Sequence, residues 1–192
     1  MGAINPYGRT KEMMEKILVD WSSVYEVSVV ILRYFNPVGA HPSGKIGENP
    51  LGIPNNLFPF VSQVAVGRQK ILKIYGNDYN TKDGTAERDY IHVMDLADAH
   101  ILCMSKFDTP GSYIYNFGSG TTSSVLEVVK AFEKASGRKI PYEFVEKRPG
   151  DSEKNFCDPK KAEKELGFVT KYSLDEMCRD GWNWQIQNPE GF

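Results

Sequence analysis

The sequence predicts an α/β fold with a parallel sheet. Helical and strand patterns alternate along the 192 residues, and the first strand, residues 27–35, has a continuous apolar centre at 29–32. Such a run is typical of a parallel strand covered by helices on both faces. Hydrophobic residues make up 41% of the chain and charged residues 25%, which excludes a disordered chain.

The expected elements follow in order along the chain. The first is a helix at 7–25, in which apolar residues recur at steps of three and four, with Pro6 just before it. After the strand at 27–35, residues 36–59 are irregular and rich in Gly and Pro, and an irregular segment of this length is often functional. Further helices are predicted at 60–67, 95–106, 124–136, 158–166 and 174–187, and strands at 72–75, 113–117 and 142–146.

Two of these helices carry boundary signals. Ser124 and Glu127 have the spacing of a capping box, and Gly137 supplies a left-handed stop for the helix at 124–136. The helix at 95–106 is preceded by an Asp or His that can cap it. We therefore expect both helices to begin and end close to these residues.

The charge balance limits the partners. Lys and Arg number 23 against 25 Asp and Glu, a formal net charge of -2, so no global field draws the chain to nucleic acid or to a membrane. Apolar runs are far shorter than the roughly 20 residues of a bilayer span. Neither the histidines nor Cys103, Cys157 and Cys178 have metal-type spacing, so we expect no metal site and buried or free thiols in the cytoplasm.

A Tyr-x-x-x-Lys pair, Tyr7 and Lys11, opens the first helix. Residues four apart lie on one face of a helix. A tyrosine has an ordinary pKa near 10, and a nearby ammonium favours the phenolate. The pair is therefore a candidate acid/base unit, although the same spacing is also common on ordinary helix surfaces.

Longer motifs give this pair a context. They are NPYG at 5–8, RYFNPVGAHPSG at 33–44, GIPNNL at 52–57, GNDY at 76–79, RDYIHVMDLA at 88–97 and the closing stretch around Trp182 and Trp184. Together they resemble the extended short-chain dehydrogenase/reductase family, and more narrowly its UDP-hexose 4-epimerases, over essentially the whole chain. The resemblance implies the C-terminal part of an extended NAD(P)-binding Rossmann-like fold plus the smaller substrate-binding domain.

The resemblance also implies roles for single residues. Tyr7 would be the catalytic acid/base at the sugar 4-hydroxyl, and Lys11 would lower its pKa and hold the nicotinamide ribose of NAD. Tyr34 and Pro37 would line the nicotinamide end of the cofactor site. The implied UDP-sugar contacts are Asn36, Asn56, Leu57, Tyr75, Arg88, Tyr90, Arg148, Asp151 and Asn155.

Within this set, the two arginines would clamp the pyrophosphate. Arg88 and Arg148 offer planar, bidentate donors, which suit phosphate oxygens. Tyr75 falls where the family packs an aromatic residue near the uracil, and Asp151 falls where it binds the ribose hydroxyls. Tyr90 would complete the nucleotide pocket.

One position bears on the choice of sugar. Asn155 falls near the place where stricter family members carry a bulky aromatic residue that limits the 2-substituent of the sugar. The smaller side chain implies room for N-acetylated UDP-hexoses, unless the neighbouring Phe156 fills the space.

The chain departs from the family pattern at its start. Family members begin with a strand, a Gly-rich turn and a helix, whereas six residues precede Tyr7 here. The Gly-x-Gly turn at 118–120 has Ser123 where a third Gly belongs, and it is interpreted as a strand-to-helix turn. We therefore expect an incomplete NAD site, with about 100 to 150 residues missing. Residues 1–36 would be a remnant of the dinucleotide-binding domain, and 37–192 mainly the UDP-sugar-binding domain with segments returning to the Rossmann sheet.

The implied activity is UDP-glucose/UDP-galactose 4-epimerisation by transient NAD-dependent oxidation at C4, a step of galactose metabolism. UDP-glucose and UDP-galactose would be the substrates, the full-length enzyme would be a homodimer that pairs partly through the first helix, and this chain alone would be inactive. Two alternatives stay open. One is a non-catalytic UDP-binding fragment, and the other is a nucleotide-sugar dehydratase or decarboxylase of the same superfamily.

Overall fold

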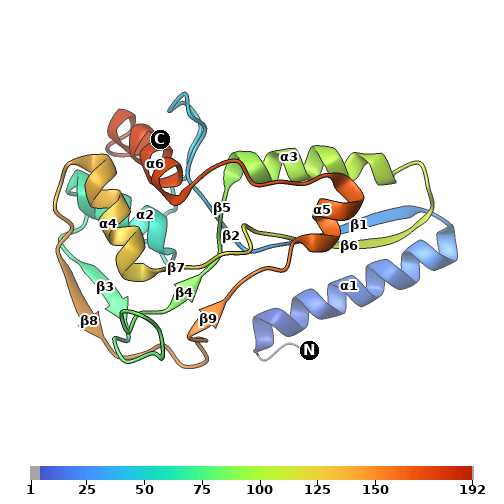
Figure 1. The fold of residues 1–192 in the computed structure, drawn as a ribbon, viewed down its shortest axis with the longest axis horizontal. Helices are drawn as coiled ribbons and strands as arrows, with labels where there is room; N and C mark the ends of the chain where they lie inside the picture. The colour runs from blue at the N-terminus through green and yellow to red at the C-terminus, as the bar shows by residue number, and fades with distance from the viewer. Residues whose placement is uncertain (1–4, 192) are drawn as a thin grey trace.

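The computed structural model of the protein describes residues 5–191. Its elements form two groups joined by short strands (Figure 1). The first group comprises α1 (Pro6–Tyr25), β1 (Ser28–Tyr34), α3 (Val93–Cys103), a 3₁₀ turn (Met104–Lys106), β6 (Gly111–Phe117) and α5 (Lys160–Leu166). The second comprises α2 (Leu57–Val66), β3 (Leu72–Tyr75), α4 (Val125–Ser136), β8 (Tyr142–Val145) and α6 (Leu174–Gln187). Between them lie β2 (Asn36–Val38), β4 (Glu87–Arg88), β5 (Tyr90–His92), β7 (Ser123–Ser124) and β9 (Lys154–Asn155).

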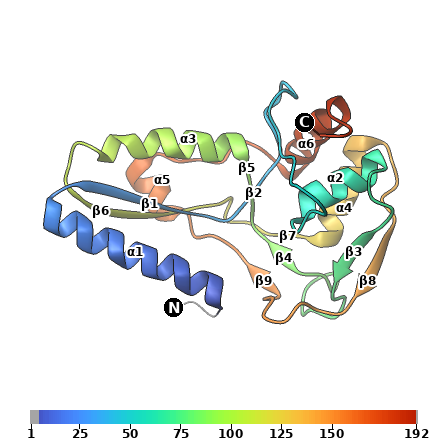
Figure 2. The same ribbon diagram turned by 180° about the vertical axis from the view of Figure 1, so that it is seen from behind.

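The first group is a parallel strand pair between helices. Strands β1 and β6 run in register from Ser28 opposite Gly111 to Tyr34 opposite Phe117. Helix α1 packs on both strands, while α3 packs on β1 and α5 on β6. Figure 1 shows α3 above the two strands and α1 below them, and Figure 2 shows the same order from behind. The predicted α/β class with parallel strands is therefore confirmed.

Short ladders connect the two groups. Strand β2 pairs in parallel with β5, with Asn36 opposite Tyr90. Strand β4 lies between β7, to which it is antiparallel, and β9, to which it is parallel. Each of these pairings covers only two or three residues, so side-chain contacts must supply much of the order in this region.

Two hydrophobic clusters form the core. The larger joins α2, α4 and α6 and contains the edge-to-face pair Phe58 and Phe132, with ring centroids 5.7 Å apart. The smaller joins α3, β6 and α5 around Phe117 and Phe168, whose ring centroids are 4.9 Å apart. The three cysteines are buried and unpaired, as expected.

The helix boundaries follow the predicted signals. Ser124 and Glu127 form the expected capping box of α4, and Gly137 ends it with φ +65°. His92 caps α3, accepting a hydrogen bond from the Met94 amide. Helix α2 begins three residues earlier than predicted, because Pro59 is tolerated in a first turn, where amides have no intrahelical partner.

The apolar stripe of α1 points away from the rest of the described chain. Met13, Ile17 and Val24 are 60%, 67% and 73% exposed. The face that packs on the sheet carries Ser22, which is buried, and Glu15, which accepts a hydrogen bond from Arg33 Nε of β1 at 2.7 Å. The apolar face of this helix is therefore not part of the core of residues 5–191.

None of the helices in residues 5–191 combines the length and the apolar character that a bilayer crossing requires.

Candidate functional site

The predicted acid/base pair lies on the first turns of α1. The Asn5 side chain accepts a hydrogen bond from the Gly8 amide at 2.8 Å, and Pro6 occupies the first turn, so the helix begins immediately before the pair. Tyr7 is 72% exposed, and the Lys11 Nζ lies 5.3 Å from the centroid of its ring. The phenol is thus open to a ligand, with an ammonium in cation–π range.

The remaining cofactor candidates follow the end of β1. Tyr34 is the last residue of this strand and is half exposed. Pro37 lies in β2, opposite Ile91 of β5. Between them, the Asn36 side-chain amide donates a hydrogen bond to the Asp89 carbonyl at 2.7 Å, which ties this segment to the residue after β4.

Arg88 and Asn155 lie opposite each other in β4 and β9. An Arg88 guanidinium nitrogen is 3.9 Å from a carboxylate oxygen of Asp151, and the Arg88 side chain is 19% exposed. Such a long, partly exposed ion pair contributes little stability, so an anionic ligand can compete for the arginine. The Asn155 side chain is exposed beside it.

A buried carboxylate supports this small ladder. Glu87 accepts a hydrogen bond from the Thr122 hydroxyl at 2.6 Å and pairs with the Lys154 ammonium at 3.1 Å. The hydrogen bond from Thr122, followed by the contact with Lys154, lowers the pKa of the Glu87 carboxyl. The charged form therefore links β4 to β9 and to the turn before β7.

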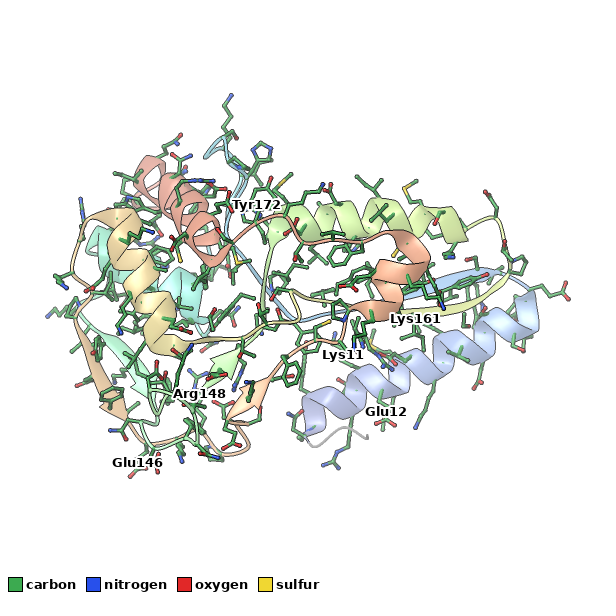
Figure 3. All side chains as sticks on the ribbon, in the orientation of Figure 1. Lys11, Glu12, Glu146, Arg148, Lys161 and Tyr172 are labelled. Atoms are coloured by element: carbon green, nitrogen blue, oxygen red, sulfur yellow. The ribbon has the colours of Figure 1, made fainter. Side chains whose placement is uncertain are left out.

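Tyr75 and Arg148 form a second cluster. Tyr75 ends β3 and is half-buried, and the guanidinium carbon of the exposed Arg148 lies 3.9 Å from its ring centroid. In Figure 3, Arg148 and Lys11 lie on opposite sides of β9. The first turn of α1 points toward β9 in both ribbon views, so the predicted catalytic and phosphate-binding residues border the same region (Figures 1 and 2).

The other predicted substrate contacts are spread more widely. Asn56 is exposed at the start of α2, and its side chain hydrogen-bonds to Glu48, opposing the rise that burial causes in the pKa of that carboxyl. Leu57 packs against the larger core cluster. Tyr90 is also in this cluster, 5.4 Å from Phe58 between ring centroids, and burial raises its pKa. A nucleotide contact by Tyr90 stays a prediction.

Sequence reasoning missed Asp89. It is fully buried, and its carboxylate accepts hydrogen bonds from the backbone amides of Ser119, Gly120 and Cys157. The signal available in the sequence was an acidic residue between two implied ligand contacts, Arg88 and Tyr90. Because these contacts occupy amides of the 118–120 turn, they support its interpretation as a structural turn.

No three His, Cys, Asp or Glu side chains within residues 5–191 gather closely enough to hold a metal ion.

Comparison with known proteins places the chain in a family. A family model described as GDP-mannose 4,6 dehydratase matches residues 1–181. Over its full length the chain is 57% identical to UDP-glucose 4-epimerases from Cyamopsis tetragonoloba and Bacillus subtilis, and it covers 56% and 57% of those proteins. The chain therefore spans a little over half the length of these curated relatives.

A solved structure gives the same result. The UDP-glucose 4-epimerase from Bifidobacterium longum, in complex with NAD+ and UDP, matches with a TM-score of 0.95 and 50% identity over 100% of this chain and 58% of that one. This confirms the expected class, the C-terminal part of an extended Rossmann-like α/β fold. The chain thus belongs to the extended short-chain dehydrogenase/reductase family that the GDP-mannose 4,6 dehydratase model describes, and is similar throughout to UDP-glucose 4-epimerases.

Proposed function

We propose that the protein containing this chain is a UDP-glucose/UDP-galactose 4-epimerase. The observation that carries the proposal is the strand pairing that brings Asn36, Arg88 and Asn155 to one region, with Asp151 next to Arg88. These are the residue types that a diphosphate and sugar hydroxyls require: a planar cation, amides and a carboxylate. The similar epimerases support the same assignment.

Within this site, we assign the nucleotide to the Arg88 and Tyr75 side. Arg88 and Arg148 bind the pyrophosphate, and Asp151 binds the ribose hydroxyls. Tyr75 offers an aromatic face to the uracil, as aromatic side chains do for bases elsewhere. Asn36, Asn56 and Leu57 contact the UDP-sugar, with Asn155 beside the hexose, and Tyr90 supports the pocket from the core.

Tyr7 and Lys11 carry the proton transfer. The Tyr7 oxygen takes the proton of the sugar 4-hydroxyl and later returns it, and the Lys11 ammonium, 5.3 Å from the centroid of the Tyr7 ring, places a positive charge beside the reacting group. The bound sugar must also be able to present either face of C4, because UDP-glucose and UDP-galactose differ only in the configuration at this carbon.

NAD is the cofactor we assign to this reaction, and the chain offers a fit for its nicotinamide end. The accessible phenol of Tyr7, the ammonium of Lys11 and the half-exposed Tyr34 with Pro37 are suited to an aromatic ring and ribose hydroxyls. The chemistry that NAD would supply there is reversible hydride transfer at C4 of the sugar. We assign the rest of the dinucleotide to residues outside this chain, since the 118–120 turn already binds Asp89.

The domain assignment follows the same division. We assign residues 1–36 to the dinucleotide-binding domain and 37–192 mainly to the UDP-sugar-binding domain, with β6 returning to pair with β1. We assign the protein to the cytoplasm and to galactose metabolism, because UDP-glucose and UDP-galactose are its proposed substrates.

The exposed apolar stripe of α1 supports a homodimer, because an exposed apolar helix face is costly to leave in water.

We also propose that N-acetylated UDP-hexoses fit the site. Asn155 is exposed in β9 and its backbone is fixed by the hydrogen bond that its carbonyl accepts from the Asp89 amide. A short amide at this position leaves room beside the sugar that an aromatic ring would fill.

Calorimetric titration of the purified chain with UDP and with NAD, together with an assay of UDP-galactose conversion, tests the proposal. We expect UDP to bind the chain, and the full-length protein to convert UDP-galactose to UDP-glucose. UDP binding without conversion by the full-length protein would support a non-catalytic UDP-binding protein instead. Formation of a 4-keto-6-deoxy or decarboxylated sugar would assign the protein to the dehydratases or decarboxylases.

A further inference from the structure

Asp89 is a buried carboxylate at the junction of the two groups of elements. It lies between β4 and β5 and is 0% exposed. One carboxylate oxygen accepts hydrogen bonds from the Ser119 amide at 2.8 Å and the Ser119 hydroxyl at 2.7 Å. The other accepts from the amides of Gly120 at 2.9 Å and Cys157 at 3.1 Å. Both oxygens are thus bound by groups that carry no net charge.

The backbone of Asp89 makes further connections. Its amide donates to the Asn155 carbonyl at 3.0 Å, and its carbonyl accepts from both the backbone amide and the side-chain amide of Asn36, at 3.2 and 2.7 Å. One residue therefore joins the start of β2, the turn after β6, and β9 with the segment that follows it. Two of these segments carry proposed ligand contacts: β2 carries Asn36 and β9 carries Asn155.

The turn at 118–120 and the 155–157 segment pack closely around the Asp89 carboxylate. A Cβ added to Gly118 would lie 2.7 Å from the Asp89 Oδ2 and 2.5 Å from the Cys157 Cβ. Because real Cβ atoms do not approach so closely, the turn reaches the carboxylate only with a glycine at this position. The turn and the 155–157 segment are therefore in direct contact with the Asp89 side chain.

The strands that carry the site need such an anchor. Arg88 and Asn155 belong to strands of two residues each, and their pairing rests on the backbone hydrogen bonds from Glu87 to Glu153 and from Asp89 to Asn155. Ladders this short are marginal without added contacts. The hydrogen bond from the Cys157 amide to the carboxylate extends the ladder by one side-chain link.

We propose that Asp89 is a positioning residue for nucleotide binding: its carboxylate holds the 155–157 segment and the 118–120 turn so that Arg88 and Asn155 face one ligand. The inference rests on the proposed function, because it takes the ligand of Arg88 to be a diphosphate. Asp89 itself touches no ligand. Replacing the carboxylate takes away at least one of the two oxygens that accept from the amides of Ser119, Gly120 and Cys157, so β9 is free to move away from β4.

The decisive variant is Asp89→Asn, compared with Asp95→Asn. Asp95 is an equally buried carboxylate that accepts hydrogen bonds from the Lys171 and Tyr172 amides, yet it lies on α3 and holds no proposed ligand residue. Calorimetric titration with UDP is run on the protein at a temperature where urea unfolding shows each variant folded. We expect the UDP dissociation constant to rise about tenfold in Asp89→Asn and less than twofold in Asp95→Asn.

If Asp89→Asn does not fold, two less disruptive variants, Ser119→Ala and Ser105→Ala, test the positioning role instead. Ser119→Ala removes one donor to the carboxylate, and Ser105→Ala removes a hydroxyl that donates only within its own segment, to the Leu102 carbonyl. We expect the UDP dissociation constant to rise about threefold in Ser119→Ala alone.

Two contrary outcomes are distinct. If the unaltered protein binds UDP and the variants bind it equally well, the positioning role of Asp89 is wrong while the proposed function stands. If the unaltered protein does not bind UDP, the proposed function fails, and the inference that rests on it fails as well.

Discussion

The Arg148 guanidinium carbon lies 3.9 Å from the centroid of the Tyr75 ring. The arginine thus covers the aromatic face that we assign to the uracil. Arg148 lies in the segment after β8, whereas Tyr75 is the last residue of β3. Because β3 and β8 pair in parallel up to Tyr75 opposite Val145, the backbone keeps the two residues together. A nucleotide that stacks on Tyr75 would displace the guanidinium toward the pyrophosphate.

This relationship predicts a large effect of Tyr75→Ala on UDP affinity. Stacking of a base on an aromatic side chain contributes about 1–3 kcal/mol, so we expect the UDP dissociation constant to rise about 5- to 150-fold. Tyr75→Phe keeps the aromatic face and should bind UDP within about twofold of the unaltered protein. Calorimetric titration measures both, and equal affinity of the Ala and Phe variants would contradict stacking on this ring.

Tyr7→Phe should separate catalysis from binding. The phenylalanine keeps the ring beside Lys11 but cannot carry the proton, so we expect the rate of UDP-galactose conversion by the full-length protein to fall about 10²- to 10⁴-fold. UDP affinity should not change, since we assign the Tyr7 hydroxyl to the 4-hydroxyl of the sugar, a group that UDP lacks. Tyr25→Phe at the other end of this helix is the matched control and should keep full activity. A Tyr7→Phe variant with normal turnover would exclude Tyr7 as the acid/base.

Asn155→Tyr should narrow the choice of sugar. A ring at this exposed position of β9 occupies the space proposed for the N-acetyl group, so the rate with UDP-N-acetylglucosamine should fall at least about tenfold relative to UDP-glucose. Phe156→Leu is the control for the neighbouring side chain. An unaltered protein with a good UDP-glucose rate and no measurable rate on the N-acetylated sugar would refute the proposed tolerance.

Local patterns predicted the elements well because their causes are local. The capping box of Ser124 and Glu127 and the stop at Gly137 depend on neighbours in the sequence, and the structure has them as predicted. The direction of the α1 stripe could not be predicted in this way. Periodicity shows that a helix has an apolar face, but not which surface covers it, and here Glu15 and Ser22 face the strands instead.

The candidate site shows the same limit. The resemblance to the family implied the residues around Arg88, and the chemistry of the arginine alone supported only its own role, because a planar guanidinium suits phosphate oxygens. Neither gave Asp89 its role, because that role depends on contacts with Ser119 and Cys157, 30 and 68 positions away. Long-range hydrogen bonds of this kind leave no periodic pattern in a sequence.

A buried histidine couples the fold to pH. His92 is 0% exposed, its Nδ1 accepts a hydrogen bond from the Met94 amide, and its ring stacks on Tyr172 with centroids 4.1 Å apart. Its Nε2 lies 3.4 Å from a carboxylate oxygen of Asp180 in α6. Burial lowers the pKa of His92, and the nearby carboxylates, Asp180 first and Asp95 next, only partly oppose it. The folded protein therefore holds this ring neutral at a pH where the unfolded chain begins to protonate it.

The sign of the resulting pH dependence follows from linkage. Below the ordinary histidine pKa of about 6.5, the unfolded chain binds a proton that folded His92 does not, so the free energy of unfolding falls as the pH falls, by up to about 1.4 kcal/mol per pH unit. Urea unfolding between about pH 7.5 and 5 measures the slope. His92→Asn keeps an acceptor for the Met94 amide without a titrating group and should flatten it, while His100→Gln, which alters an exposed histidine, should not. Identical slopes in the unaltered protein and His92→Asn would mean that His92 is not the group responsible.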